Sequence, residues 1–241
     1  MTRLVLFVLV MTILACQEPK SERREPAASR VAEKGLEAKA VTYRAPDGGE
    51  IHADESGEGE RSVLLAHGGR FDKESWSEQA RALAKAGFRV LAIDFRGYGQ
   101  SKPGPGATDR YAGLYLDVLG GIRYLRETGA KEVSVVGGSM GGWAAAEASI
   151  ASEPGELDRL VLLASSPVDS PEKLKGKKLF LIARDDPSAD GTPRLLRFQD
   201  QYERAPEPKE LVILDGAAHA QHIFGTDQGE RLMQEILRFL K

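Results

Sequence analysis

The chain has 241 residues, with 33 basic and 36 acidic side chains and a formal net charge of −3. No segment is strongly basic, so the composition gives no support to nucleic-acid binding. Neither a His or Cys cluster with metal-ligand spacing nor a dinucleotide-binding fingerprint occurs, and we therefore expect no metal and no cofactor.

The N-terminus has the pattern of an export signal. One basic residue, Arg3, precedes an apolar run over residues 4–15. This run is shorter than the about 20 apolar residues that a membrane-spanning helix needs. The pattern therefore predicts a secretory signal peptide over residues 1–15.

Cys16 follows this run directly and is the only cysteine of the chain. Residues 13–16, Ile-Leu-Ala-Cys, resemble a bacterial lipobox, in which the cysteine after the cleavage site receives a lipid. A lone cysteine cannot form an internal disulfide, and lipidation would give the thiol a role. We expect Cys16 to be the lipid attachment site of an exported lipoprotein, anchored to a membrane of the bacterial cell envelope. The alternative is ordinary signal cleavage, with Cys16 discarded or left free.

The segment after Cys16 is rich in Glu, Lys, Arg, Ser, Pro and Ala and offers almost nothing to bury. Such a segment cannot offset the entropy that ordering would cost. We therefore expect a flexible tether over residues 16–39 and one folded domain over residues 40–241. About 200 residues suffice for a sizeable hydrophobic core.

The predicted domain opens with two short apolar segments, residues 41–43 and 51–53, joined through Pro-Asp-Gly-Gly at 46–49 as in a β-hairpin. Apolar runs then alternate with helical stretches. Strands are expected near Val63, Val90, Val135, Val161, Phe180 and Val212, and helices around Ala80, Val118, Ala145, Phe198 and Leu237. This alternation predicts an α/β fold with a mainly parallel sheet and helices on both faces.

Residues 137–142, Gly-Gly-Ser-Met-Gly-Gly, lie between an apolar run at 133–136 and an Ala-rich helical stretch at 143–150. A strand, a tight turn and a helix in this order are the context of a nucleophile elbow. Gly137 and Gly141 stand where larger side chains would collide, and Ser139 lies at the apex, next to a helix N-terminus. The pattern predicts that Ser139 is a catalytic nucleophile.

Two later strand ends carry the groups that a serine nucleophile needs. The expected strand at residues 178–183 is followed by Asp185 and Asp186, and the strand at 211–214 is followed by His219. A serine becomes reactive when a base takes its proton and a third group orients that base. The order Ser, Asp, His supplies each part.

This order, with acid and base just past strand ends, resembles the α/β-hydrolase superfamily. Residues 64–69, Leu-Leu-Ala-His-Gly-Gly, are similar to its oxyanion-loop motif. Residues 93–101, Ile-Asp-Phe-Arg-Gly-Tyr-Gly-Gln-Ser, are similar to its D-x-R-G-x-G-x-S segment. The resemblance covers the chain from about Val41 to the end. It implies an α/β-hydrolase fold and a serine hydrolase that acts through Ser139.

The resemblance implies His219 as the base, and His222 close behind it is the main rival. His67 precedes the serine and is expected to fix its own loop. For the acid, the family pattern favours an aspartate just before a turn, and Asp186 before Pro187 fits best. The alternatives are Asp185 and Asp190 in the same loop, and Asp169 after the preceding strand.

Backbone amides are expected to bind the oxyanion that forms when Ser139 attacks. The resemblance implies that of Met140, directly after the nucleophile, and a second one from Gly69 or Arg70. Arg70 stands where some lipases have the third glycine of a His-Gly-Gly-Gly loop. Because of this difference, the second amide can be that of Gly69 or that of Arg70. The side chain of Arg70 also places a cation near the pocket mouth.

The connection at residues 165–178 is where many relatives insert a helical lid, and here it is too short to build one. We therefore expect an uncovered site open to small acyl substrates, and a serine esterase without a lid domain. A peptidase, thioesterase or acyltransferase could use the same triad. A lipoprotein of the envelope that kept the fold only as a non-catalytic binding module is the alternative of another class.

Overall fold

The computed structural model describes residues 37–106, 109, 111–188 and 190–241. The predicted signal peptide, Cys16 and the tether up to residue 36 lie outside these described residues. The first described strand begins at Lys39.

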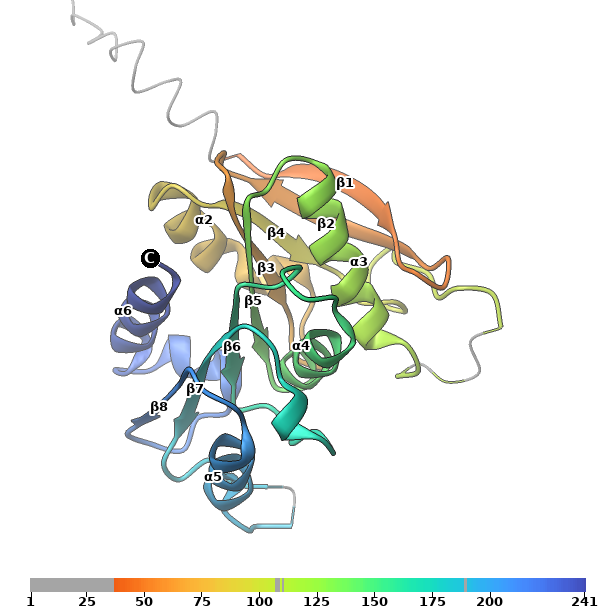
Figure 1. Ribbon diagram of the computed structural model, residues 1–241. Coiled ribbons are helices and arrows are strands. Elements are labelled where there is room, and N and C mark those ends of the chain that lie inside the picture. Colours follow the sequence, from red (N-terminus) through yellow and green to blue (C-terminus); the bar gives the residue numbers. More distant parts are fainter. Residues whose placement is uncertain (1–36, 107–108, 110, 189) are drawn as a thin grey trace, which may run out of the picture.

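An eight-stranded sheet forms the centre of the domain (Figure 1). Its strands are β1 (Lys39–Arg44), β2 (Glu50–Ser56), β3 (Arg61–Ala66), β4 (Arg89–Ile93), β5 (Glu132–Gly138), β6 (Arg159–Leu163), β7 (Lys177–Ala183) and β8 (Lys209–Leu214). They lie in the order β1-β2-β4-β3-β5-β6-β7-β8. The strands from β4 to β8 in this order run parallel, whereas β2 is antiparallel to both β1 and β4. The α/β-hydrolase fold predicted from the sequence is therefore confirmed.

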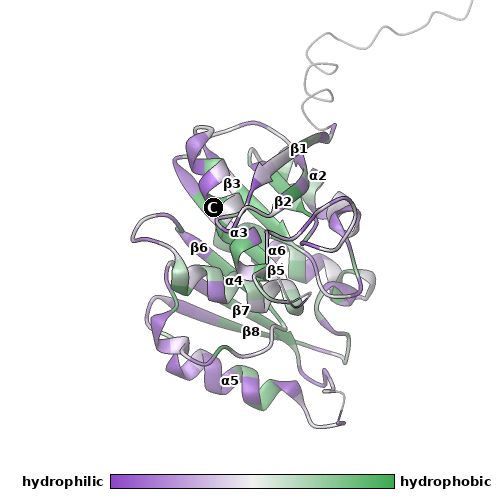
Figure 2. Ribbon diagram, turned by 90° about the vertical axis from the view of Figure 1, so that its right-hand side faces the viewer, coloured by the Kyte–Doolittle hydropathy of each residue, from purple (hydrophilic) through white to green (hydrophobic). Residues whose placement is uncertain are grey.

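The central strands are buried on both faces, as their uninterrupted Val and Leu runs require. In β3, β5, β6 and β7, nearly every residue after the first is buried. Figure 2 shows these strands as the hydrophobic centre, with α5 largely hydrophilic at the periphery. The edge strand β8 differs, since most of its residues are only half-buried.

Helices cover both faces of the sheet. They are α2 (Ser77–Lys85), α3 (Leu114–Glu127), α4 (Met140–Ala151), α5 (Arg194–Arg204) and α6 (Gly229–Leu240), with short 3₁₀ turns η1 (Lys73–Trp76), η2 (Pro171–Lys173) and η3 (Ala220–Gly225). In Figure 1, α2 and α6 lie on one side of the sheet and α3 and α4 on the other. The Ala-rich helix α4 is mostly buried, whereas α6 turns one apolar stripe inward.

A buried charge network joins the opening hairpin to the segment after β4. The guanidinium of Arg96, whose side chain is only 2% exposed, contacts the carboxylates of Asp47 and Asp117 at 2.6 and 2.7 Å. Arg96 also donates its backbone N–H to Asp117 at 2.9 Å. These bonds anchor the start of the D-x-R-G segment to α3, which packs against β3 and β5.

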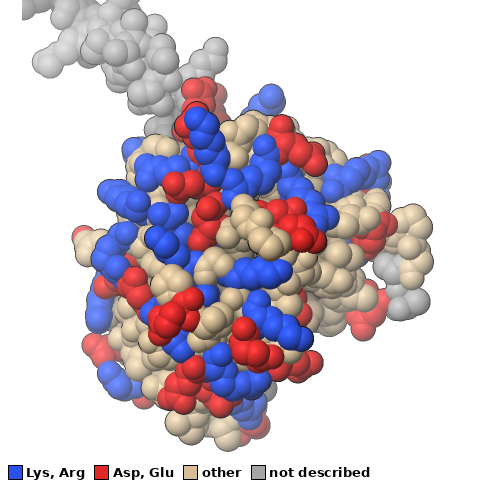
Figure 3. Space-filling model, viewed as in Figure 1, with Lys and Arg blue, Asp and Glu red and all other residues tan. Residues whose placement is uncertain are grey.

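Three further observations concern the surface. Between β6 and β7 the chain forms only η2, so no lid covers the sheet there. Among the described residues, no helix is both long and apolar enough to span a bilayer. On the face seen in Figure 3, basic and acidic side chains are interspersed.

Candidate active site

Ser139 lies at the turn between β5 and α4, in a strained backbone conformation. Its φ and ψ are 53° and −114°, and such a positive φ is rare for a residue with a side chain. A Cβ on Gly137 would lie 2.4 Å from the carbonyl oxygen of Gly141, and a Cβ on Gly141 would lie 2.3 Å from that of Ala66. Both positions therefore exclude side chains, as the sequence pattern predicts for a nucleophile elbow.

The loops after β7 and β8 bring an acid and a base to this serine. The Oγ atom of Ser139 lies 2.8 Å from Nε2 of His219. The other ring nitrogen of His219, Nδ1, lies 2.7 Å from Oδ2 of Asp186. These three side chains, far apart in the sequence, form the continuous hydrogen-bonded chain that a nucleophile, a base and an orienting acid require.

The backbone explains why Asp186 rather than Asp185 faces the histidine. Asp185 donates its N–H to the carbonyl of Gly216, which ties the β7 loop to the β8 loop. The next residue, Asp186, then turns inward and is fully buried, whereas Asp185 is exposed. The remaining candidates, Asp169 and Asp190, are also exposed, and Asp190 bonds to Thr192.

His222, the rival base, does not contact Ser139. It is exposed, and its ring lies 4.9 Å from that of Phe71, at the rim of the same cavity. His67 is fully buried instead. Its Nδ1 lies 2.8 Å from the carbonyl oxygen of Gly68, and its Nε2 accepts the backbone N–H of Phe95. Burial lowers the pKa of His67, so a neutral ring holds the loop after β3.

The loop after β3 forms a tight turn beside Ser139. Phe71 donates its N–H to the carbonyl of Gly68 at 3.0 Å. The N–H of Gly68 is bonded to Oε1 of Gln221 at 2.6 Å, and the carbonyl of Gly69 accepts the hydroxyl of Tyr98 at 2.9 Å. Within the described part of the chain, the N–H groups of Gly69 and Arg70 donate to no protein group.

Gly69 is a neighbour of the predicted oxyanion donor Met140. A Cβ on Gly69 would lie 3.5 Å from the sulfur of Met140. Gly69 therefore lies beside the side chain of Met140, and both residues line the cavity with Ser139. Arg70 follows in the turn and lines the cavity with both of them.

A cavity of about 630 Å³ opens above Ser139, Met140 and His219. Its walls include Phe71, Pro187, Ala217 and Ala220, which give it an apolar character. The size and the lining are those of a site for a small ligand. Tyr111, half exposed, lines it from the segment before α3.

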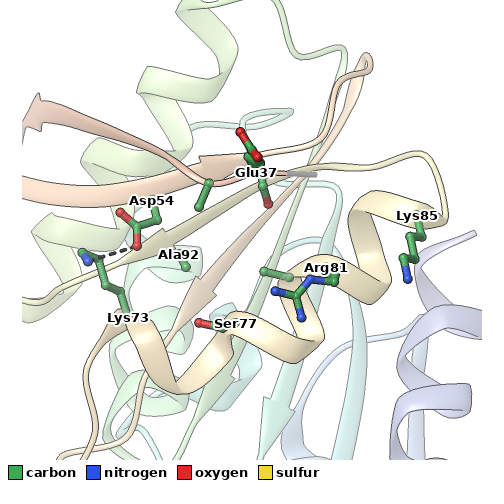
Figure 4. Close-up of a pocket in the computed structure, with 10 residues that line it drawn as sticks. Glu37, Asp54, Lys73, Ser77, Arg81, Lys85 and Ala92 are labelled. Atoms are coloured by element: carbon green, nitrogen blue, oxygen red, sulfur yellow. Dashed lines mark hydrogen bonds and ion pairs between the residues drawn. The ribbon is translucent and has the colours of Figure 1, made fainter. Parts of the chain in front are cut away.

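A second cavity, of about 520 Å³, lies between α2 and the first strands (Figure 4). Its lining includes Asp54, Lys73, Ser77 and Arg81, and the ammonium of Lys73 bonds to the carboxylate of Asp54 at 3.0 Å. No residue of the Ser139 site lines it. In the described residues, no group of three His, Cys, Asp or Glu side chains could hold a metal ion.

Several groups around the site carry no signal in the sequence. Gln221 joins the loop after β3 to the segment that follows His219, and a lone glutamine two residues after a histidine predicts nothing of this kind. Arg194, at the start of α5, lies 3.5 Å from Oδ1 of Asp186. Tyr98 belongs to a segment that the sequence did single out, but its bond to Gly69 depends on the fold.

Comparison of the sequence with known protein families identifies the class of protein to which this fold and site belong. A model of the alpha/beta hydrolase family matches residues 63–234, and the chain belongs to this family.

Individual relatives share only about a third or less of their aligned residues with this chain. A 2-hydroxy-6-oxononadienedioate/2-hydroxy-6-oxononatrienedioate hydrolase of a Pseudomonas species is 28% identical over 175 residues, which cover 70% of this chain and 59% of that protein. The hydrolase of the same name from Cupriavidus pinatubonensis is 31% identical over 61% of this chain and 52% of that protein. The chain thus spans little more than half the length of these curated relatives.

Among solved structures, an esterase of Pyrococcus furiosus superposes with a TM-score of 0.70 at 20% identity, covering 86% of this chain and 92% of that one. An esterase of Exiguobacterium antarcticum gives a TM-score of 0.68 at 15% identity, covering 84% of this chain and 99% of that one. These likenesses establish the shared fold.

Proposed function

We propose that the protein is a serine hydrolase that cleaves carboxylic esters of small acyl compounds through an acyl-enzyme intermediate. The observation that carries the proposal is the chain of two short hydrogen bonds from Ser139 through His219 to Asp186, at 2.8 and 2.7 Å. The position of Ser139 at a strained turn, facing an open cavity, supports its role as the nucleophile.

In the first half of the reaction, His219 takes the proton of the Ser139 hydroxyl through Nε2 while Oγ attacks the acyl carbon. Asp186 keeps the proton on Nδ1 and stabilises the imidazolium that forms. The tetrahedral intermediate then collapses, the ester C–O bond breaks, and His219 passes its proton to the departing alcohol. The acyl group is left on Ser139.

In the second half, water attacks the acyl-enzyme and gives its proton to His219. Collapse of the second tetrahedral intermediate releases the carboxylic acid and returns the proton to Ser139. We assign the negative charge of both intermediates to the backbone amides of Met140 and Gly69. Two observations support this assignment. The neighbouring amide, that of Gly68, already donates its N–H to Gln221, and Gly69 lies beside Met140.

The absence of a lid between β6 and β7 supports short acyl substrates and a site that needs no lipid interface to open. The N-terminal sequence supports an exported protein held at a membrane by a lipid on Cys16, at the bacterial cell envelope. The same triad could serve amide or thioester cleavage or acyl transfer, so the ester preference is the part of the proposal that needs a substrate panel.

The test combines a covalent probe with such a panel. The full-length protein should react with a fluorophosphonate at Ser139 and hydrolyse p-nitrophenyl acetate and butyrate. The Ser139→Ala variant should do neither. Matched amides, thioesters and esters of increasing chain length then define the reaction. A wild-type protein that is neither labelled nor active on any of these substrates would favour the non-catalytic binding module instead.

A further inference from the structure

The cavity above Ser139 carries more cationic than anionic side chains. Arg70 and Arg194 line it, and Asp186 is the only carboxylate in the described part of its lining. Asp186 is fully buried and already bonded to His219. Asp186 also lies 3.5 Å from Nε of Arg194, so this one carboxylate serves both the imidazole and Arg194. No described carboxylate on the lining pairs with Arg70.

Arg70 extends from the turn that carries the oxyanion amide of Gly69. It is exposed, and in the described part of the structure its guanidinium makes no ion pair or hydrogen bond. Asp72, the acidic residue nearest to Arg70 in the sequence, is exposed and does not line the cavity. The side chain thus keeps its full set of donors available beside the nucleophile.

Arg194 faces the cavity from the start of α5. Its Nε donates to the carbonyl of Pro187 at 3.0 Å, which fixes the base of the guanidinium. The side chain is 31% exposed, and its two Nη groups bond to no described protein group. A guanidinium held at one nitrogen and open at the others is suited to receive a carboxylate.

Phe71, Met140 and Pro187 line the same cavity as the two arginines and can accept a short apolar chain. A ligand that fills this cavity would therefore meet both apolar surface and positive charge. A small molecule with a short carbon chain and a carboxylate matches both features.

We propose that the substrates of this site are small esters that carry a carboxylate, which Arg70 recognises at the mouth of the cavity with Arg194 as a second cation. The inference rests on the proposed ester hydrolysis at Ser139 and adds the charge of the substrate. The carboxylate can belong to the acyl part, as in the half-ester of a dicarboxylic acid, or to the alcohol part.

The experiment compares esters that differ in charge. For the acyl part, monoethyl glutarate is compared with ethyl valerate; for the alcohol part, 4-acetoxybenzoate is compared with 4-acetoxybenzamide. In each pair the ratio of kcat/KM, charged over neutral, is the readout. We expect a ratio of about ten in the pair that matches the natural substrate, because a hydrogen bond between an arginine and a carboxylate is stronger than one to a neutral group. Added salt should lower the ratio.

Two substitutions of Arg70 test the assignment. Arg70→Gln should bring the ratio close to one and Arg70→Glu should bring it below one. A substitution that lowers kcat/KM equally for the charged and the neutral ester leaves the ratio unchanged. Arg197→Gln is the matched control, because this exposed arginine of α5 pairs with Asp190 and does not line the cavity. It should leave the ratio unchanged.

A wild-type ratio near one in both pairs, or a high ratio that neither Arg70 variant lowers, would overturn the inference while ester hydrolysis stands. Binding of glutarate and valerate to the Ser139→Ala variant, measured by calorimetry, gives a readout that does not need turnover. Tighter binding of glutarate that is lost in Ser139→Ala/Arg70→Gln supports the recognition of a carboxylate. Equal binding contradicts it. Failure of the wild type to hydrolyse any of the four esters would instead remove the proposed function.

Discussion

Gly68 donates its backbone N–H to Oε1 of Gln221 at 2.6 Å, although 153 residues separate the two in the sequence. The Nε2 of Gln221 reaches on to Oγ of Ser75 at 2.8 Å. Gln221 lies only two residues after His219. The side chain of Gln221 therefore links two parts of the site: the turn that contains Gly69, and the segment that carries the proposed base, His219.

Gln221→Leu should lower kcat on a short ester about ten-fold, with a much smaller change in KM. The substitution leaves the N–H of Gly68 buried without a partner, which costs about 1–3 kcal/mol, and it frees the turn whose neighbouring amide is assigned to the oxyanion. Gln234→Leu, at an exposed position of α6, is the control and should keep wild-type kinetics. An equal rise in KM with unchanged kcat would show that Gln221 serves ground-state binding instead.

Asp186→Asn should be nearly inactive and Asp185→Asn should keep most of its activity, measured on the same ester. Loss of the carboxylate that orients the imidazole favours the wrong tautomer, which costs about 10⁴ in turnover in the best-studied protease triad. Asp185 is exposed, and its backbone rather than its side chain joins the two loops. Near-normal turnover in both variants would contradict the assignment and move the acid elsewhere.

Two inactive variants of Ser139 should differ in stability. Ser139→Ala and Ser139→Gly both remove the hydroxyl, but only glycine relieves the backbone at φ 53° and ψ −114°. Strain of this kind costs about 1–3 kcal/mol, part of which the greater freedom of glycine in the unfolded chain offsets. We expect the free energy of unfolding in urea to be higher for Ser139→Gly by about 1 kcal/mol. Equal stabilities would mean that the turn stores no such strain.

Much of the fold follows from local patterns in the sequence. The Val and Leu runs of β3 to β7 predict strands buried on both faces, because no polar alternation interrupts them, and the structure confirms each of them. The edge strand β8 is less buried than its sequence, Lys-Glu-Leu-Val-Ile-Leu, suggests. Its position at the end of the sheet leaves one side without a neighbour, and no local pattern contains that information.

The site divides in the same way. Gly137, Ser139 and Gly141 could be predicted because the constraint on them is local: a side chain on either glycine would meet backbone atoms of the elbow or of β3. The hydrogen-bond partners of Gly68 and Arg96 could not be predicted, because Gln221 and Asp117 come close to them only in the folded sheet. Long-range polar contacts depend on how elements pack, which spacing in the sequence does not encode.

The anchor at Cys16 remains a prediction from sequence. In a bacterial host, the full-length protein should sediment with membranes and carry acyl chains that mass spectrometry detects on Cys16. Cys16→Ser should release the protein or stall its processing, whereas Ser21→Ala, in the same polar segment, should behave as the wild type. A soluble wild-type protein without acyl chains would refute the lipoprotein proposal and leave the hydrolase proposal unaffected.

Arg96→Met should destabilise the fold by about 3 kcal/mol. The guanidinium of Arg96 is buried with the carboxylate of Asp117, and removing one partner of such a pair leaves an uncompensated charge. Arg44→Met is the matched control, because the ion pair of Arg44 with Glu50 is largely exposed and should contribute less than about 1 kcal/mol. Urea unfolding at pH 8 measures both. A penalty for Arg96→Met no larger than that of the control would contradict the importance of the buried network.

The penalty for Arg96→Met should also depend on pH. Burial raises the pKa of Asp117 to about 6 even though Arg96 opposes the rise, so the loss of Arg96 should raise it further. A carboxyl group with a raised pKa in the folded state stabilises the fold at low pH and loses that contribution as the pH rises through the folded-state pKa. Between pH 6 and pH 8 the variant should therefore lose more stability than the wild type. Unfolding in urea at both values should show a smaller penalty at pH 6, and a penalty that is the same at both would indicate that Asp117 does not take up a proton when Arg96 is gone.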